Sequence, residues 1–173
     1  MRSQFTLKVA MYGLFYLCTC GIAQDSTLIN FKLKDQFDKK YTKATWEGQI
    51  LVIIGSDREG SKYSSSWGSA ISDSMSGDPN YSNIQIAGLS DLRGVPFFLK
   101  SYVRGKFPKE KHQWVLMDWK GLFPKTYQFR EKLSNILIFG TDGRLIYQTS
   151  VAEMDLSKLK MIVSILTNEL NHK

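Results

Sequence analysis

The chain has 173 residues and carries 23 lysine and arginine residues against 16 aspartate and glutamate residues, a net charge of +7. This length is sufficient for one ordinary domain with its own core. The sequence has no helix-turn-helix, zinc-finger or RNP-like pattern, so we do not expect a nucleic-acid partner. No His, Cys, Asp and Glu residues have the spacing of metal ligands, and neither a metal nor another cofactor is expected.

The first 23 residues are typical of an export signal. Arg2 and Lys8 carry positive charge, an apolar run of about 14 residues follows, and small residues precede Gln24. The run is shorter than the ~20 residues that span a membrane. We therefore expect a signal peptide over residues 1–23 and a single mature domain over residues 24–173. That domain would be periplasmic or secreted, with no membrane span and a net charge of about +5, since only Arg2 and Lys8 leave.

Both cysteines of the chain, Cys18 and Cys20, lie inside this N-terminal segment. The sequence Leu-Cys-Thr-Cys also resembles a lipobox, in which Cys20 would be lipidated and the protein would be a membrane-anchored lipoprotein. An uncleaved anchor, or no export at all, is a further alternative. Secretion leaves no cysteine and lipidation leaves one blocked thiol, so we expect no structural disulfide.

Hydrophobic periodicity predicts strands that alternate with helices. The unbroken apolar run 50–54 predicts a central strand that is buried on both faces, and residues 61–75 repeat apolar side chains at helical spacing. Asp142-Gly143 is typical of a hairpin turn, and Asp155 is the expected cap of the last helix. The other expected strands are 27–33, 41–42, 84–89, 114–118, 135–139 and 144–148. The other expected helices are 96–105 and 156–170. The segment 123–133 is expected to be a connection with packed aromatic side chains.

This order predicts an α/β sandwich with a mixed sheet. At this level the chain resembles the thioredoxin-like superfamily, specifically the redoxin branch of peroxiredoxins and exported thiol-disulfide proteins. The resemblance rests on the strand end 115–121, on the Asp-Gly hairpin 136–147, and on the segment 31–48, which is similar to the N-terminal hairpin that those proteins add. It implies a thioredoxin-like sandwich over residues 28–170, with a central mixed sheet flanked by helices and an N-terminal β-hairpin extension.

The resemblance also implies a redox site, and there the sequence departs from the family. The two cysteine positions of the family fall near Glu59 and Lys62, and its cis-proline falls near Ser134, where we expect a trans peptide bond. The expected mature chain has no thiol for exchange. We therefore hypothesise an exported, redox-inactive protein, not an enzyme, that binds a partner protein or an anionic ligand in the cell envelope. The alternative is a redoxin-type oxidoreductase that acts with the thiol of a partner.

The candidate binding site follows the central strand. Two cations lie there beside the start of a helix, where backbone amides and the helix dipole favour an anion. A third cation lies at the end of a neighbouring strand, and strand ends are where open α/β sheets hold ligands. Two alternatives stay open: the nearby acids neutralise the cations and only cap the helix, or Asp57 or Glu59 acts in acid–base catalysis. The candidate residues are Asp57, Arg58, Glu59, Ser61, Lys62 and Arg93.

Two surface features lie outside this site. The predicted second helix is apolar on all sides, with Phe97–Leu99 and Tyr102–Val103, and we expect part of it to be a contact surface, as in redoxin dimers. A homodimer is therefore one alternative for the assembly. The densest positive stretch, residues 104–111, is either solvated surface or a preference for anionic surfaces and ligands. His112 and His172 are expected at the surface.

Overall fold

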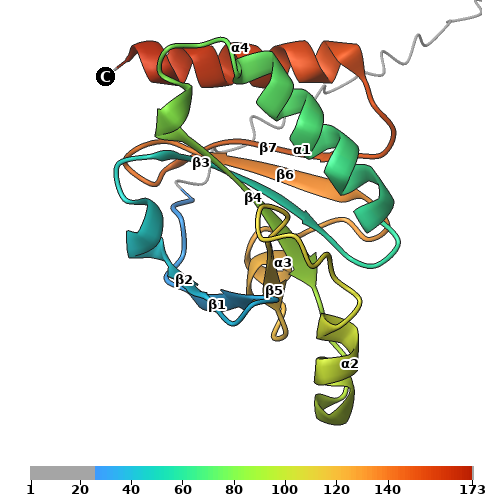
Figure 1. The fold of residues 1–173 in the computed structure, drawn as a ribbon. Coiled ribbons are helices and arrows are strands. Elements are labelled where there is room, and N and C mark those ends of the chain that lie inside the picture. The colour runs from blue at the N-terminus through green and yellow to red at the C-terminus, as the bar shows by residue number, and fades with distance from the viewer. Residues whose placement is uncertain (1–25, 173) are drawn as a thin grey trace, which may run out of the picture.

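The computed structural model of the protein describes residues 26–172, and the expected signal peptide and both cysteines lie outside this range. It contains one mixed, seven-stranded sheet in the order β2-β1-β5-β4-β3-β6-β7 (Figure 1). The strands are β1 (Lys32–Asp35), β2 (Lys40–Thr42), β3 (Ile50–Ser56), β4 (Ile84–Asp91), β5 (Val115–Asp118), β6 (Ser134–Phe139) and β7 (Leu145–Val151). The α-helices are α1 (Ser61–Met75), α2 (Lys100–Arg104), α3 (Leu122–Thr126) and α4 (Leu156–Asn171), and short 3-10 turns span Lys43–Trp46, Tyr81–Asn83 and Phe97–Leu99.

Strand β3 organises the sheet, because it pairs parallel with β4 and antiparallel with β6. All seven of its residues are buried, as an unbroken apolar run predicts for a strand covered on both faces. Strand β5 extends the parallel part beyond β4. Strands β1 and β2 form an antiparallel hairpin that is attached to β5. The predicted central strand and the N-terminal hairpin are both confirmed.

The sheet separates two hydrophobic cores. Helices α1 and α4 cover one face together (Figure 1), with Trp67, Ile71, Ile162 and Leu166 among their fully buried side chains. Trp67 and Ile71 are one turn apart, which is the spacing that places apolar side chains on a single helix face. The opposite face is covered by Phe123 of α3 and Tyr127 at its end, and by Tyr41 and Trp46 from the hairpin region. The α/β sandwich predicted from the sequence is confirmed.

Helices α1 and α4 occupy the predicted ranges to within one residue, and the Asp155 carboxylate accepts hydrogen bonds from the N–H groups of Ser157 and Lys158, as a cap does. All peptide bonds in the described range are trans, including the one after Ser134. None of the described helices is both long and apolar enough to cross a membrane.

Three predicted elements were wrong in extent or type. The strand predicted over 27–33 is confined to Lys32–Asp35, because residues 27–29 bond instead to the β6–β7 turn and to Tyr127. Leu28 donates its N–H to the Gly143 carbonyl, so this segment runs beside the turn and not within a strand pair. The connection 123–133 begins with a short helix, α3. The second helix is a 3-10 turn followed by only five α-helical residues.

Candidate functional site

The candidate residues lie at the edge of the sheet where β3 and β4 end. The loop 57–60 joins β3 to α1, and the loop 130–133, which leads into β6, faces it across the sheet edge. Asp57, Asp91, Arg93 and Arg130 line one narrow crevice between these loops. Arg93 therefore lies at the same sheet edge as the Asp57 loop, as the order of the strands predicts.

Asp57 ties the two loops together. Its Oδ1 accepts a hydrogen bond from the N–H of Gly60 at 2.7 Å, and its Oδ2 accepts one from the N–H of Lys132 at 2.8 Å. One carboxylate oxygen thus holds a backbone N–H directly before α1, as a cap does, and the other holds a backbone N–H of the loop that leads into β6. This arrangement corresponds to the capping alternative, extended by a bond to the opposite loop.

The two loops also touch through their backbones at Gly60. A Cβ atom built on Gly60 would lie 2.2 Å from the carbonyl oxygen of Leu133, a distance that real Cβ atoms do not adopt. Only a residue without a side chain permits this approach, although the Gly60 backbone itself has ordinary right-handed dihedral angles. The residue after Leu133 is Ser134, near which the resemblance places the cis-proline of redoxins.

The two candidate cations, Arg58 in the loop and Lys62 in the first turn of α1, remain exposed, and neither forms an ion pair within the described residues. The ammonium group of Lys62 lies 4.8 Å from the centre of the Tyr63 ring, and the Arg58 guanidinium has no hydrogen bond in this range. Glu59 pairs instead with Lys132, at 3.4 Å and with both side chains largely exposed. Neither Asp57 nor Glu59 therefore forms an ion pair with Arg58 or Lys62.

The start of α1 has few free backbone donors for an anion. Gly60 donates to Asp57 Oδ1, Ser61 donates its N–H to the Asp57 carbonyl, and Tyr63 donates to the Gly60 carbonyl. The hydroxyl of Ser61 donates to the Arg58 carbonyl at 2.7 Å. Any anion at this site would therefore be held mainly by side-chain charge.

Arg93 forms an ion pair with Asp91. Its guanidinium forms a forked pair with Asp91, with Nη2 to Oδ2 at 2.7 Å and Nε within 3.0 Å of both carboxylate oxygens. The hydrogen bonds to Asp91 raise the pKa of Arg93 further. Its side chain also packs over Gly121, where an added Cβ would lie 1.9 Å from Arg93 Cδ. Arg93 lies beside the candidate site, but its charge is already compensated.

Behind the loop lies a buried polar network that the sequence analysis did not predict. The hydroxyl of Ser64 lies 2.9 Å from that of Ser56 and 3.0 Å from that of Ser134. Next to them the Asn135 amide donates to the carbonyls of Arg130 and Leu133, and its oxygen accepts from the N–H of Arg130 and the hydroxyl of Ser150. The only sequence signal was a polar Ser-Asn pair directly before a buried apolar run, in a β-strand where such side chains need partners.

The described residues form no nucleophilic or metal centre. Residues 26–172 contain no cysteine, and among them no group of His, Cys, Asp and Glu side chains is arranged to hold a metal ion. The clustered serine hydroxyls have no base beside them in the described range, since they bond to one another.

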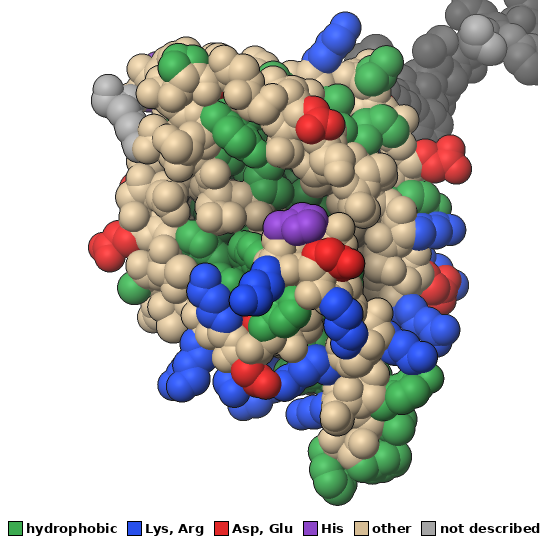
Figure 2. Space-filling model, viewed as in Figure 1, with side chains coloured by type: hydrophobic (Ala, Val, Ile, Leu, Met, Phe, Trp, Pro, Cys, Tyr) green, Lys and Arg blue, Asp and Glu red, His purple; other side chains and the backbone are tan. Residues whose placement is uncertain are grey.

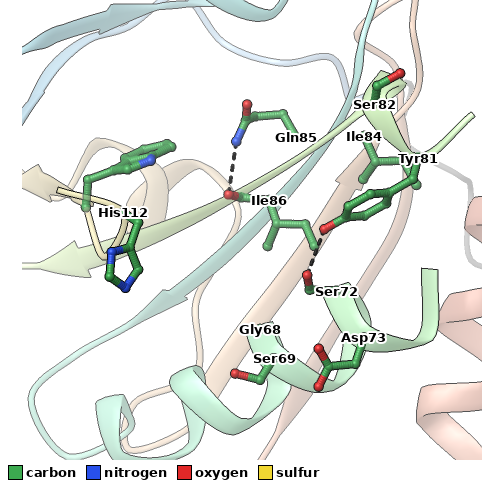
Figure 3. A pocket seen from close by; sticks show the side chains of 11 residues that line it. Gly68, Ser69, Ser72, Asp73, Tyr81, Ser82, Ile84, Gln85, Ile86 and His112 are labelled. Carbon is green, nitrogen blue, oxygen red and sulfur yellow. Dashed lines mark hydrogen bonds between the residues drawn. The ribbon is translucent and has the colours of Figure 1, made fainter. Parts of the chain in front are cut away.

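A second hollow, of about 530 Å³, lies along the C-terminal half of α1 and the start of β4 (Figure 3). It is lined largely by polar side chains, with Ser72 and the Tyr81 hydroxyl bonded at 2.7 Å and the Gln85 amide bonded to the Ile86 carbonyl. Ser72, Tyr81 and Gln85 are thus bonded within the hollow itself. His112 lies at its rim and is exposed, as expected.

No protein-family model matches the sequence, and no curated protein matches it. Several solved structures, in contrast, have a fold similar to that of this protein. A chain described as the thiol:disulfide interchange protein DsbE from Chlorobium tepidum aligns with a TM-score of 0.60 at 12% identity, over 84% of this chain and 96% of that one. The exposed lipoprotein thioredoxin Etrx1 from Streptococcus pneumoniae aligns with a TM-score of 0.55 at 16% identity, over 77% and 99%. The thioredoxin domain of a thiol-disulfide oxidoreductase from Bacteroides vulgatus aligns with a TM-score of 0.55 at 11% identity, over 84% and 98%.

These identities are low enough that the likeness establishes the fold and not the activity. It covers almost the whole length of each similar structure. The protein has the thioredoxin-like fold of the redoxin proteins, and residues 26–172 build that fold without a cysteine.

Proposed function

We propose that the protein is an exported thioredoxin-like protein without a redox centre of its own, and that it binds an acidic partner protein or an anionic ligand through the loop 57–62. The observation that carries this proposal is which charged side chains of residues 57–62 have bonding partners and which do not. Arg58 and Lys62 are exposed and without acidic partners in the described range, while Asp57 and Glu59 are engaged elsewhere. An arginine fork and a lysine suit a carboxylate or phosphate.

The fixed backbone of the loop supports a binding role. Asp57 holds both sides of the crevice, and Gly60 lies against the backbone of Leu133. A surface that is already ordered loses little conformational freedom when a partner binds. Ser61 belongs to the same surface through its exposed position between the two cations.

Site-specific photo-crosslinking in the native cell tests the proposal. A photoreactive residue at position 61 is expected to capture a partner, and Arg58→Glu/Lys62→Glu is expected to lower the yield of adduct about tenfold or more, because charge reversal opposes an acidic partner. Lys158→Glu/Lys160→Glu on α4 is the matched control, with the same change in net charge, and should leave the adduct unchanged. Equal losses in both variants would contradict a role for the loop.

An insulin-reduction assay distinguishes the oxidoreductase alternative. We expect the full chain and its Cys18→Ser/Cys20→Ser variant to give the same background rate with dithiothreitol. A rate that rises in the wild type and is lost in the variant would favour a redoxin activity that uses the N-terminal cysteines.

The proposed export is tested by the intact mass of the protein from its native envelope. A chain that begins at Gln24 would support secretion. An acylated chain that begins at Cys20 would support the lipoprotein alternative. A full-length mass would contradict cleavage and keep both thiols in the protein.

A further inference from the structure

The segment between β4 and β5 exposes a concentrated group of large apolar side chains. The exposed fractions are 82% for Phe97, 69% for Phe98, 40% for Leu99 and 64% for Tyr102. We call these four residues the aromatic tip. Figure 1 shows α2 projecting away from the sheet, and Figure 2 shows hydrophobic side chains at the end of this projection with lysine and arginine side chains nearby. Soluble proteins rarely leave such groups exposed without a use.

The tip is fastened to the body of the protein at its base. Arg104 forms an ion pair and hydrogen bond with Asp38 of the β1–β2 turn at 2.6 Å, and Lys100 lies 5.2 Å from the centre of the Trp119 ring. The same turn exposes Phe37, with 40% of its surface accessible. The Phe97 and Phe98 rings meet edge to face, with centroids 5.7 Å apart. The tip is therefore an ordered, convex projection.

Positive charge surrounds these apolar side chains. Residues 96–111 carry five cations and one acid, Glu110, for a net charge of +4. Lys106 lies 4.8 Å from the centre of the Tyr102 ring, so its ammonium group is directly beside the tip. Lys109 and Lys111 are exposed farther along the segment. The five cations are Lys100, Arg104, Lys106, Lys109 and Lys111.

We propose that the aromatic tip docks on the surface of an anionic phospholipid bilayer, independently of the function proposed for the loop 57–62. Exposed aromatic and leucine side chains favour the headgroup–acyl boundary, and flanking lysines favour anionic headgroups. A convex projection can enter a fluid interface without a complementary pocket. A second copy of the chain is disfavoured as the occupant, because paired tips would bring two segments of charge +4 together.

An environment-sensitive fluorophore tests where the tip goes. The dye is attached at Phe98→Cys in full-length Cys18→Ser/Cys20→Ser protein, so that its signal reports the tip and not the N-terminal segment. With vesicles of phosphatidylcholine and phosphatidylglycerol we expect a blue shift and an intensity gain of about twofold or more, and neither with phosphatidylcholine alone. High salt should reverse the change, because it screens the flanking cations.

A matched probe and charge variants complete the test. Leu156 is also 69% exposed, but Glu153 and Asp155 offset Lys158 and Lys160, so residues 153–160 have no net charge and the dye at Leu156→Cys should not respond. Lys106→Ala/Lys109→Ala should lower the vesicle partition coefficient of the Phe98→Cys probe roughly thirtyfold, since each lysine near the surface contributes about one kcal/mol.

Three outcomes would overturn the proposal. The first is an unchanged Phe98→Cys probe with anionic vesicles, and the second is an equal response from the Leu156→Cys probe. The third is concentration-dependent dimerisation that Phe97→Ser/Phe98→Ser abolishes, without any response to vesicles, which would assign the tip to a second copy of this chain. A probe that responds only to an acidic protein would likewise reject the bilayer. None of these results bears on photo-crosslinking at the loop 57–62.

Discussion

Gly60 lies where two backbones come closest at the candidate site. Glycine is required here because the Leu133 carbonyl occupies the space that a Cβ atom would need. The backbone dihedral angles of Gly60 would be accessible to any residue. The neighbouring Asp57 carboxylate holds the same two segments by hydrogen bonds to backbone N–H groups. Close approach and hydrogen bonding thus fix the loop on which Arg58 and Lys62 stand.

We expect Gly60→Ala to lower the free energy of unfolding by about 1–3 kcal/mol, because the added methyl group must push the two loops apart. Chemical denaturation measures this change. Gly77→Ala is the control, since a Cβ at Gly77 would have no neighbour within 4 Å. We expect this variant to leave the free energy of unfolding unchanged or to raise it by up to about 1 kcal/mol. Equal stability of Gly60→Ala and wild type would show that the loops can separate freely.

At the scale of elements, the start of α4 depends on one carboxylate. Asp155 has an extended backbone and its Oδ1 accepts from the N–H of Ser157 at 2.9 Å and of Lys158 at 3.2 Å. The helix presents Ile162, Leu166 and Leu170 to the core under β3 and β6. The cap therefore stabilises an element that closes one face of the sheet.

Asp155→Ala should destabilise the protein by about 1 kcal/mol, the usual cost of an N-cap, as measured by urea denaturation. Glu153→Ala removes the same charge two residues earlier, from an exposed side chain outside the helix, and should change stability by less than about 0.5 kcal/mol. A similar loss in both variants would mean that charge near the helix start, and not the cap, supplies the stabilisation.

The β1–β2 hairpin contains a buried ionisable pair that links its stability to pH. The Tyr41 hydroxyl donates to Asp35 Oδ2 at 3.2 Å, and Tyr41 is 3% exposed. Burial, followed by the charge of Asp35, raises the pKa of Tyr41 to about 12. Burial also raises the pKa of Tyr127, which bridges Thr27 and Ile29 on the same face.

Because the folded pKa of Tyr41 lies above its unfolded value near 10, its contribution is complete below about pH 10 and is lost as pH rises toward about 12. Over this window the wild type should lose about 2–3 kcal/mol more stability than Tyr41→Phe, which cannot ionise. Denaturant unfolding of both proteins at matched pH values measures the difference. Parallel losses in the two proteins would contradict the assignment to Tyr41.

At the scale of the whole molecule, residues 26–172 form a thioredoxin-like fold that contains no cysteine. Its stability comes from two cores on the two faces of one sheet, with Trp67 and Phe123 as the largest fully buried side chains on each. A fold with this much buried apolar surface needs no covalent staple.

We therefore expect the full chain to unfold at the same denaturant midpoint with and without a reducing agent. Cys18→Ser/Cys20→Ser should share that midpoint, because neither cysteine belongs to the described fold. A wild-type midpoint that falls on reduction, while that of the variant stays constant, would reveal a stabilising disulfide.

The sequence by itself determined the elements whose signal is local. The apolar run at residues 50–54 identified the central strand, the helical spacing in 61–75 identified α1, and Asp155 marked the start of α4, because propensity, burial and capping are read from neighbouring residues. It also placed the candidate loop and Arg93 at one sheet edge, because consecutive parallel strands end on the same side.

Only the tertiary structure decided which groups at that edge are free and which are engaged. Asp57 reaches Lys132, 75 residues away, while Arg93 stays with Asp91 and leaves Arg58 and Lys62 exposed. The segment 27–31 fails as a strand for the same reason, since its partners belong to the β6–β7 turn and α3. Such long-range pairings depend on how the elements pack together, and no local pattern of residues encodes them.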